Sequence, residues 1–125
     1  MRRNGMLGHE YSYLAIAWAR GSYTLRLVRG HVKDPGAPGE AAEDLSQETA
    51  ISAPRLWLKA MVREGCRVSY AWSEDGERFQ AFDVTFPVRE GTWTGAKLAV
   101  FALNSSNRAS AGYADLDSIH FRKAD

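Results

Sequence analysis

The chain has 125 residues, of which 45% are hydrophobic and 25% are charged. This length fits one domain and leaves no room for a second, and the composition is that of an ordinary globular protein rather than a disordered or membrane chain. The 16 Lys and Arg residues balance 15 Asp and Glu residues to a net charge of +1, without a sustained basic face, so nucleic acid is not expected as a partner.

The sequence also shows few features that indicate membrane insertion, secretion, disulfide formation or zinc binding. No stretch approaches the ~20 apolar residues that a membrane-spanning helix requires. No apolar segment follows Arg2 and Arg3, so the sequence shows no secretory signal and predicts a cytoplasmic location. Cys66 is the one cysteine, which excludes an intrachain disulfide, and its place in an alternating pattern predicts a buried thiol. The three histidines and this cysteine lack the spacing of a zinc site.

Apolar residues alternate with a period of two in several short runs, which is typical of strands. Runs at 11–18 and 23–29 flank Arg20-Gly21-Ser22 and predict a hairpin. Residues 30–50 begin with a Pro- and Gly-rich stretch and continue with an acidic one. This composition predicts a surface loop.

Regular alternation resumes at Arg55. Residues 55–63 and 66–72 predict two strands joined at Glu64-Gly65, and Asp75-Gly76 predicts a further turn before a strand at 79–86. Two more runs, at 93–103 and 113–121, complete the series. Many short strands joined by regular turns indicate one all-β domain over residues 1–125, an antiparallel sandwich or barrel.

Three segments in a fixed order go beyond a generic β pattern. They are Tyr70-Ala71-Trp72-Ser73-Glu74-Asp75-Gly76-Glu77-Arg78-Phe79, Trp93-Thr94-Gly95-Ala96-Lys97, and Gly112-Tyr113-Ala114-Asp115-Leu116-Asp117. Together they resemble the C-terminal concanavalin A-like sandwich domain of family 43 glycoside hydrolases, the β-xylosidase and arabinofuranosidase group. Residues 5–15 extend the resemblance to nearly the whole chain. It implies a jelly-roll sandwich with these scaffold positions: Trp72, Asp75, Gly76, Phe79, Trp93, Gly95, Lys97, Asp115 and Asp117.

The resemblance also implies a function. In that family the domain accompanies a glycosidase catalytic domain, so we expect a non-catalytic accessory role in binding xylan or xylo-oligosaccharides, or in domain and oligomer assembly. The strands that precede this part of the family's domain, and its catalytic propeller, have no counterpart in this sequence. Uncovered sheet edges and core faces are therefore expected. One alternative is a self-associating protein that completes its sandwich with a partner chain, as a homo-oligomer, and another is an independent glycoside hydrolase.

Aromatic residues supply the candidate carbohydrate contacts, because sugars lay their C–H surfaces on flat rings beside polar groups. Trp57 shares a predicted strand face with Lys59 and Arg63 and is the first candidate. Trp18, on the less uniform face of its strand, is the second. Burial of either ring in the core is the competing interpretation, since aromatic residues dominate sandwich cores.

The sequence assigns no carboxylate a catalytic role. Asp115 and Asp117 are spaced by two on a predicted strand and would share a face. Calcium binding or acid–base catalysis is one interpretation of this pair, and hydrogen bonding to neighbouring turns is the other. Asp75 and Glu77 flank Gly76, and turn formation explains that arrangement. No catalytic residue and no cofactor is assigned, with calcium at the Asp115 and Asp117 pair as the alternative.

Overall fold

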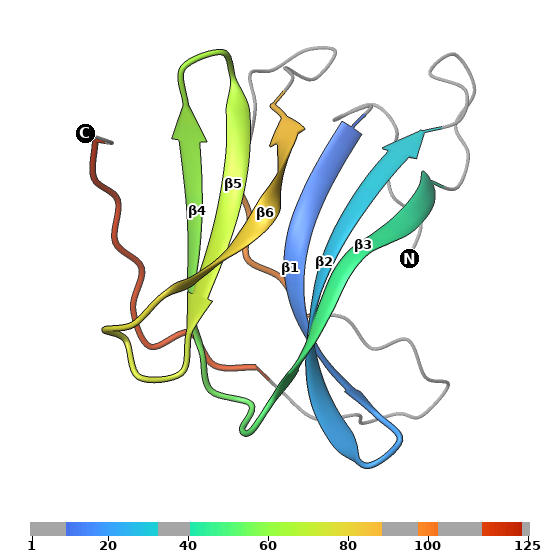
Figure 1. Cartoon of the computed structure of the whole chain (residues 1–125), viewed down its shortest axis with the longest axis vertical. Coiled ribbons are helices and arrows are strands. Elements are labelled where there is room, and N and C mark those ends of the chain that lie inside the picture. Colours follow the sequence, from blue (N-terminus) through green and yellow to red (C-terminus); the bar gives the residue numbers. More distant parts are fainter. Residues whose placement is uncertain (1–9, 33–40, 89–97, 103–113, 124–125) are drawn as a thin grey trace.

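The computed structural model describes residues 10–32, 41–88, 98–102 and 114–123. Within these ranges the chain forms two three-stranded antiparallel sheets (Figure 1). The first sheet has the order β1-β2-β3, with β1 at Glu10–Ala19, β2 at Ser22–Val32 and β3 at Ala41–Ile51. The second has the order β4-β5-β6, with β4 at Trp57–Arg63, β5 at Arg67–Ser73 and β6 at Gln80–Pro87. The prediction of an all-β sandwich is confirmed.

Two tight turns set the registers of the hairpins. Between β1 and β2, Arg20 and Gly21 have φ angles of 54° and 78°, the pair of positive values that a type I′ turn requires. Between β4 and β5, Gly65 and Cys66 have φ angles of 78° and 53°. Cys66 is exposed in this turn, so the prediction of a buried strand thiol is wrong, because closing the loop takes this residue out of the strand.

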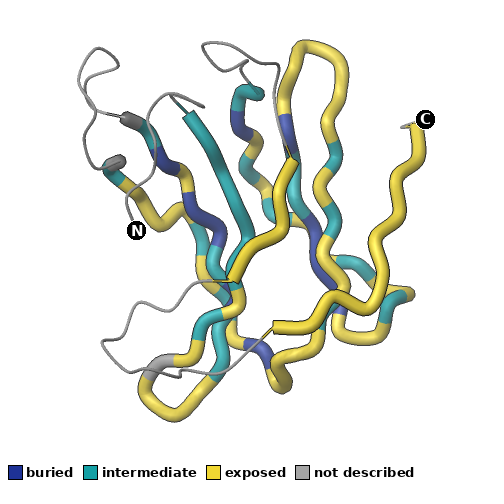
Figure 2. Tube along the Cα trace, turned by 180° about the vertical axis from the view of Figure 1, so that it is seen from behind, coloured by how far each residue is buried: buried dark blue, intermediate teal, exposed yellow. Residues whose placement is uncertain are grey.

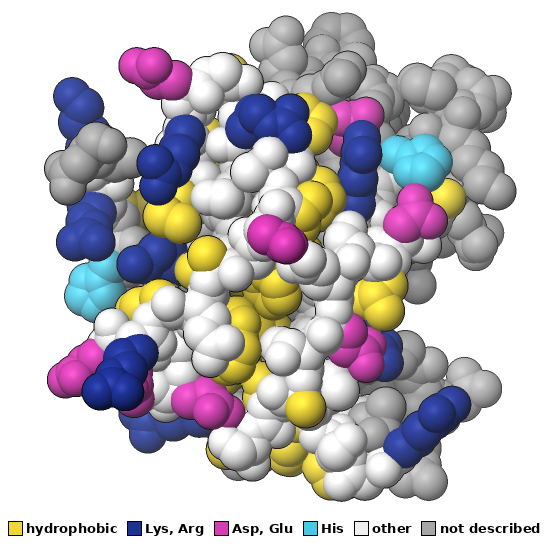
Figure 3. All heavy atoms as spheres, in the orientation of Figure 1, with side chains coloured by type: hydrophobic (Ala, Val, Ile, Leu, Met, Phe, Trp, Pro, Cys, Tyr) yellow, Lys and Arg dark blue, Asp and Glu magenta, His cyan; other side chains and the backbone are white. Residues whose placement is uncertain are grey.

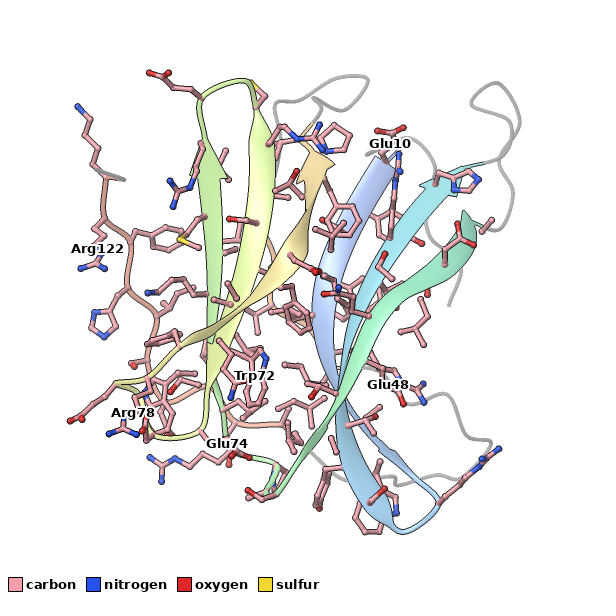
Figure 4. All side chains as sticks on the ribbon, in the orientation of Figure 1. Glu10, Glu48, Trp72, Glu74, Arg78 and Arg122 are labelled. Carbon is pink, nitrogen blue, oxygen red and sulfur yellow. The ribbon has the colours of Figure 1, made fainter. Side chains whose placement is uncertain are left out.

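The core lies between the facing sheets. Leu14 and Ile16 of β1 stand opposite Leu27 and Leu25 of β2, so all four side chains point to the inner face, and the two leucines of β2 are fully buried. Trp72 packs against Leu25 from the second sheet, and Figure 4 shows its side chain in the space between the sheets. Hydrophobic side chains gather there in Figure 3 as well. The other buried hydrophobic residues of the two core clusters are Ile51, Val68 and Phe86.

The second sheet is displaced sideways relative to the first. The Tyr70 hydroxyl of β5 donates to the Ser12 carbonyl of β1 over 3.1 Å, and a side-chain hydrogen bond joins β3 to β6. Thus β1 faces β5 and β3 faces β6, and no described strand covers the inner face of β4. On that face Leu58 and Val62, opposite Trp72 and Val68, remain 47% and 56% exposed. The expected uncovered core face is therefore present at β4.

The predicted surface loop at 30–50 is wrong for most of its length. Residues 30–32 belong to β2, and residues 41–50 belong to β3, while residues 33–40 lie outside the described ranges. Strand β3 pairs with β2 along its length, but the register shifts between Leu27 and Val28, which leaves Ser46 as an extra residue. This bulge switches the face to which odd-numbered residues point. It thereby hides the alternation by which a strand is recognised.

The two C-terminal runs also differ from expectation. The described parts of these runs, residues 98–102 and 114–123, form no strand, and Figure 2 shows both segments as exposed throughout. Neither segment enters a hydrogen-bonded ladder, so apolar alternation alone does not make a strand there. Trp93, Gly95 and Lys97 lie outside the described residues. Across the described part of the chain, no helix has the length and apolar character needed to cross a membrane.

Candidate functional site

The loop after β5 is held by hydrogen bonds to one carboxylate. Asp75 Oδ1 accepts from the backbone N–H groups of Glu77 and Arg78 and from the Ser73 hydroxyl, each over 2.8 Å. The Ser73 oxygen in turn accepts from the Gly76 N–H over 2.9 Å. These bonds favour the ionised form of Asp75, with the Arg78 N–H contributing most, so its pKa lies below the ordinary value. The Asp75-Gly76 signature is therefore a turn device, as its sequence indicates.

A second carboxylate ties this loop to the first sheet. Glu74 Oε1 accepts from the backbone N–H of Ser52 over 2.9 Å and from its hydroxyl over 2.7 Å. The backbone bond is the larger cause that lowers the pKa of Glu74. Figure 4 shows Glu74 at the foot of the second sheet, beside the connection from β3 to β4. The loop is thus held internally by Asp75 and tied to the first sheet by Glu74, which gives it a defined position beneath the ring described next.

Trp57 lies over this fixed loop on the outer face of the second sheet. It stands opposite Ser73, and a Cβ on Gly76 would come within 2.9 Å of its Cε2 atom. The glycine therefore lets the indole rest directly on the loop backbone. The ring remains 40% exposed, and the Arg55 guanidinium carbon lies 5.6 Å from its centroid. The sequence left exposure and burial of Trp57 open, and the structure shows a side chain that is partly exposed and partly packed on the loop.

The other cations predicted beside Trp57 separate along the strand. Lys59 Nζ lies 4.0 Å from the centroid of the Phe79 ring, so its ammonium group is held by a cation–π contact. Arg63 lies opposite Arg67 at the far end of the hairpin. Arg55, which the sequence did not single out, instead places its guanidinium group over the indole.

Trp18 occupies a different place. It is opposite Tyr23 at the end of the β1–β2 hairpin, and the two ring centroids are 4.5 Å apart with a 60° angle between the planes. The ring is 61% exposed although its register places it on the inner face. Because Trp18 belongs to the first sheet and Trp57 to the second, the structure does not join them into one aromatic surface.

Asp115 and Asp117 are exposed in the segment 114–123. Asp117 Oδ2 lies 3.5 Å from an Arg55 nitrogen, with both side chains largely in solvent. Among the described residues, no group of three or more His, Cys, Asp or Glu side chains is placed to hold a metal ion. The predicted strand that would align the two carboxylates does not form there.

Sequence reasoning missed a polar and aromatic group on the outer face of the first sheet. The Tyr11 and Tyr13 hydroxyls donate to the two carboxylate oxygens of Glu43 over 2.7 and 2.8 Å. The rings are nearly parallel, with an angle of 7° between their planes. The Tyr-x-Tyr spacing was an available signal, but its partner Glu43 fell in the region expected to be a loop.

The fold and the turn signatures define a class of protein, and comparison with known families gives the same class. Residues 6–122 match the family of β-xylosidase C-terminal concanavalin A-like domains, and the chain belongs to this family. Among curated proteins, it is similar to a β-xylosidase from Formosa agariphila, with 42% identity over 67 residues. The match covers 54% of this chain but only 11% of the length of that β-xylosidase. No solved structure matches the chain.

Proposed function

We propose that this chain is a non-catalytic accessory domain of glycoside-hydrolase type that binds xylan-type oligosaccharides, with Trp57 as a contact residue. The observation that carries the proposal is the Trp57 ring, which is 40% exposed and rests on the loop backbone at Gly76. A ring with a rigid support presents its face to a ligand with little loss of side-chain entropy. The name of the relative, β-xylosidase, supports xylose-based saccharides as the ligand class.

The carboxylates support a non-catalytic role. Glycoside hydrolysis needs two carboxyl groups on opposite sides of the scissile bond, one of them able to donate a proton. Asp75 and Glu74 accept hydrogen bonds that lower their pKa, which makes each a poorer proton donor near neutral pH. Asp117 lies beside Arg55 in solvent. We expect no turnover of aryl xylosides.

Titration with xylohexaose, followed by indole fluorescence and by backbone NMR, tests the binding role. We expect saturable changes at Trp57 and at the loop 74–79, and at least a tenfold weaker affinity in Trp57→Ala. Trp18→Ala is the matched control, because that ring is more exposed but stands on the other sheet. An unperturbed spectrum at millimolar ligand would exclude saccharide binding.

A second candidate function is assembly, and the exposed inner face of β4 favours it. Leu58 and Val62 lie on the core side of the second sheet, yet about half of each side chain is exposed. Soluble proteins rarely leave such core-facing positions uncovered. The occupant that fits is the same strip of a second copy, because a two-fold interface pairs a surface with itself.

Sedimentation velocity across a concentration series tests this second candidate. We expect a concentration-dependent dimer that Leu58→Asp abolishes. Leu45→Asp is the control, since Leu45 has similar exposure but lies on the outer face of β3. A strictly monomeric wild-type chain that is stably folded would rule out assembly through this strip.

A further inference from the structure

We propose that the outer face of the second sheet also holds an anion subsite, formed by Lys59, Arg63 and Arg67. The ligand class is a xylose-based chain that bears an acidic substituent, either a uronic carboxylate or a sulfate ester. This inference rests on the proposed function, because it extends the contact at Trp57 along the same strand and assigns a charge to the saccharide.

The three cations share one face because of the register of β4 and β5. Lys59 and Arg63 follow Trp57 by even numbers of residues, so all three side chains point away from the core. Arg67 joins this row, since β5 brings it directly opposite Arg63. From the first residue of β4 to the last, the strand rises about 20 Å, a length that suits an extended chain of several sugar rings. Figure 3 shows Lys and Arg side chains gathered on the β4 side of the molecule.

Arg63 and Arg67 form a pair of like charges. Side chains directly opposite on antiparallel strands have Cβ atoms about 5 Å apart, and like charges there are destabilising. The Arg67 guanidinium is held in place, because it donates to the Thr85 hydroxyl over 2.8 Å and to the Thr85 carbonyl over 3.0 Å. The Arg63 guanidinium contacts the Met61 sulfur over 3.9 Å. Within the described ranges neither arginine forms an ion pair, not even with Glu64 in the adjoining turn. An anion between the two guanidinium groups would remove their repulsion.

The Lys59 ammonium is positioned by an aromatic ring. Its Nζ atom lies 4.0 Å from the centroid of the Phe79 ring, and the side chain is half-buried. No carboxylate among the described residues forms an ion pair with it. A cation that is held in place before binding loses less side-chain entropy when a ligand arrives. Lys59 is therefore prepared to bind an acidic group near the middle of the row.

The acids of the loop and of the C-terminal segment lie at the other end of the row. Asp117 lies 3.5 Å from Arg55, whose guanidinium is over the Trp57 indole. Glu74 and Asp75 belong to the loop beneath this ring, and each accepts a backbone N–H. An acidic substituent at the indole would meet these carboxylates. It is therefore expected toward the opposite end of β4, with a neutral sugar ring at Trp57.

Calorimetry on the whole chain tests the subsite with three ligands. They are xylohexaose, the same chain with one glucuronic acid branch, and the same chain with one sulfate group. Lys59→Gln and Arg63→Gln each remove one charge from the row, whereas Lys59→Arg keeps it and remains informative should Lys59→Gln fail to fold. Arg20→Gln is the matched control, because it removes one charge from an exposed position in the turn of the other sheet. Thermal unfolding checks that each variant is folded.

We expect the wild type to bind an acidic ligand about fivefold more tightly than xylohexaose, and high salt to remove most of this preference. Lys59→Gln and Arg63→Gln should each reduce the preference about threefold, whereas Lys59→Arg and Arg20→Gln should retain it. The more tightly bound of the two acidic ligands identifies the substituent. Equal wild-type affinity for all three ligands, or a preference unchanged in both charge-removing variants of the row, would overturn this inference and leave the proposed function standing. Absence of wild-type binding to every ligand would overturn both.

Discussion

Replacing Gly76 by alanine should destabilise the fold through two separable effects. Gly76 has a φ of 80°, and an L-residue in the left-handed region costs roughly 1–2 kcal/mol. The added Cβ would also lie 2.9 Å from Trp57 Cε2 and 3.2 Å from Cδ2 and Cζ2. The indole must therefore lift from the loop and lose part of its packing, which adds about 1 kcal/mol.

Gly65→Ala is the matched control for this variant. Gly65 has a φ of 78°, and a Cβ there would meet nothing within 4 Å. Alanine at this position therefore has only the conformational cost of the backbone. Urea unfolding followed by indole fluorescence would give both free energies of unfolding. We expect Gly76→Ala to lose about 2–3 kcal/mol and Gly65→Ala about 1–2 kcal/mol. Equal losses in the two variants would refute the contact between Trp57 and Gly76.

Three further predictions concern the core, the loop and its acids. Leu25→Ala should cost about 2–5 kcal/mol of unfolding free energy, because this side chain is fully buried; a loss below 1 kcal/mol in urea melts would contradict its core position. Ser73→Ala should cost about 1–3 kcal/mol of unfolding free energy, because Ser73 is 1% exposed and its removal leaves the backbone N–H groups of Asp75 and Gly76 without this acceptor. Ser69→Ala on the same strand face is the control. The lowered pKa values of Glu74 and Asp75 mean that their contribution to stability is present above their ordinary pKa values. It is lost as the pH falls through the lower folded values, so melting temperature should drop below about pH 4, and Asp75→Asn should flatten that drop.

The alkaline side offers an independent check. Burial raises the pKa of Tyr70, and its hydrogen bond with Ser12 opposes that rise. A phenol whose pKa is higher in the folded state keeps its full contribution below the ordinary value of about 10. That contribution disappears as the pH rises through the folded value. Tyr70→Phe should therefore reduce the loss of stability between pH 10 and pH 12, measured by circular dichroism.

The sequence was sufficient where strand alternation and turn chemistry agree. The hairpin at Arg20-Gly21 and the face assignments of residues 57–63 follow from local rules that the structure obeys. It was insufficient at β3, where acidic residues have weak strand propensity and the bulge at Ser46 reverses the face pattern. That strand depends on partners distant in sequence, such as the tyrosines that bind Glu43.

The candidate sites show the same division. The polar neighbours on its strand face made Trp57 a candidate for an exposed ring, with burial in the core as the alternative. The support beneath it was not, because the distance between Gly76 and the indole depends on how the β5–β6 loop folds back over β4. For the same reason the contact between the Arg55 guanidinium and the indole was missed.

The order of strands in the sheets bears on how the chain folds. Each sheet is built from consecutive strands, one within residues 10–51 and the other within residues 57–87, so no described strand crosses between sheets. Each half can assemble from contacts between neighbouring hairpins, which favours rapid formation. Alone, either half would leave its apolar side in water, so stability appears only when the halves dock through Leu25 and Trp72. A chain cut at Ala53-Pro54 should therefore yield two fragments that reassociate by fragment complementation.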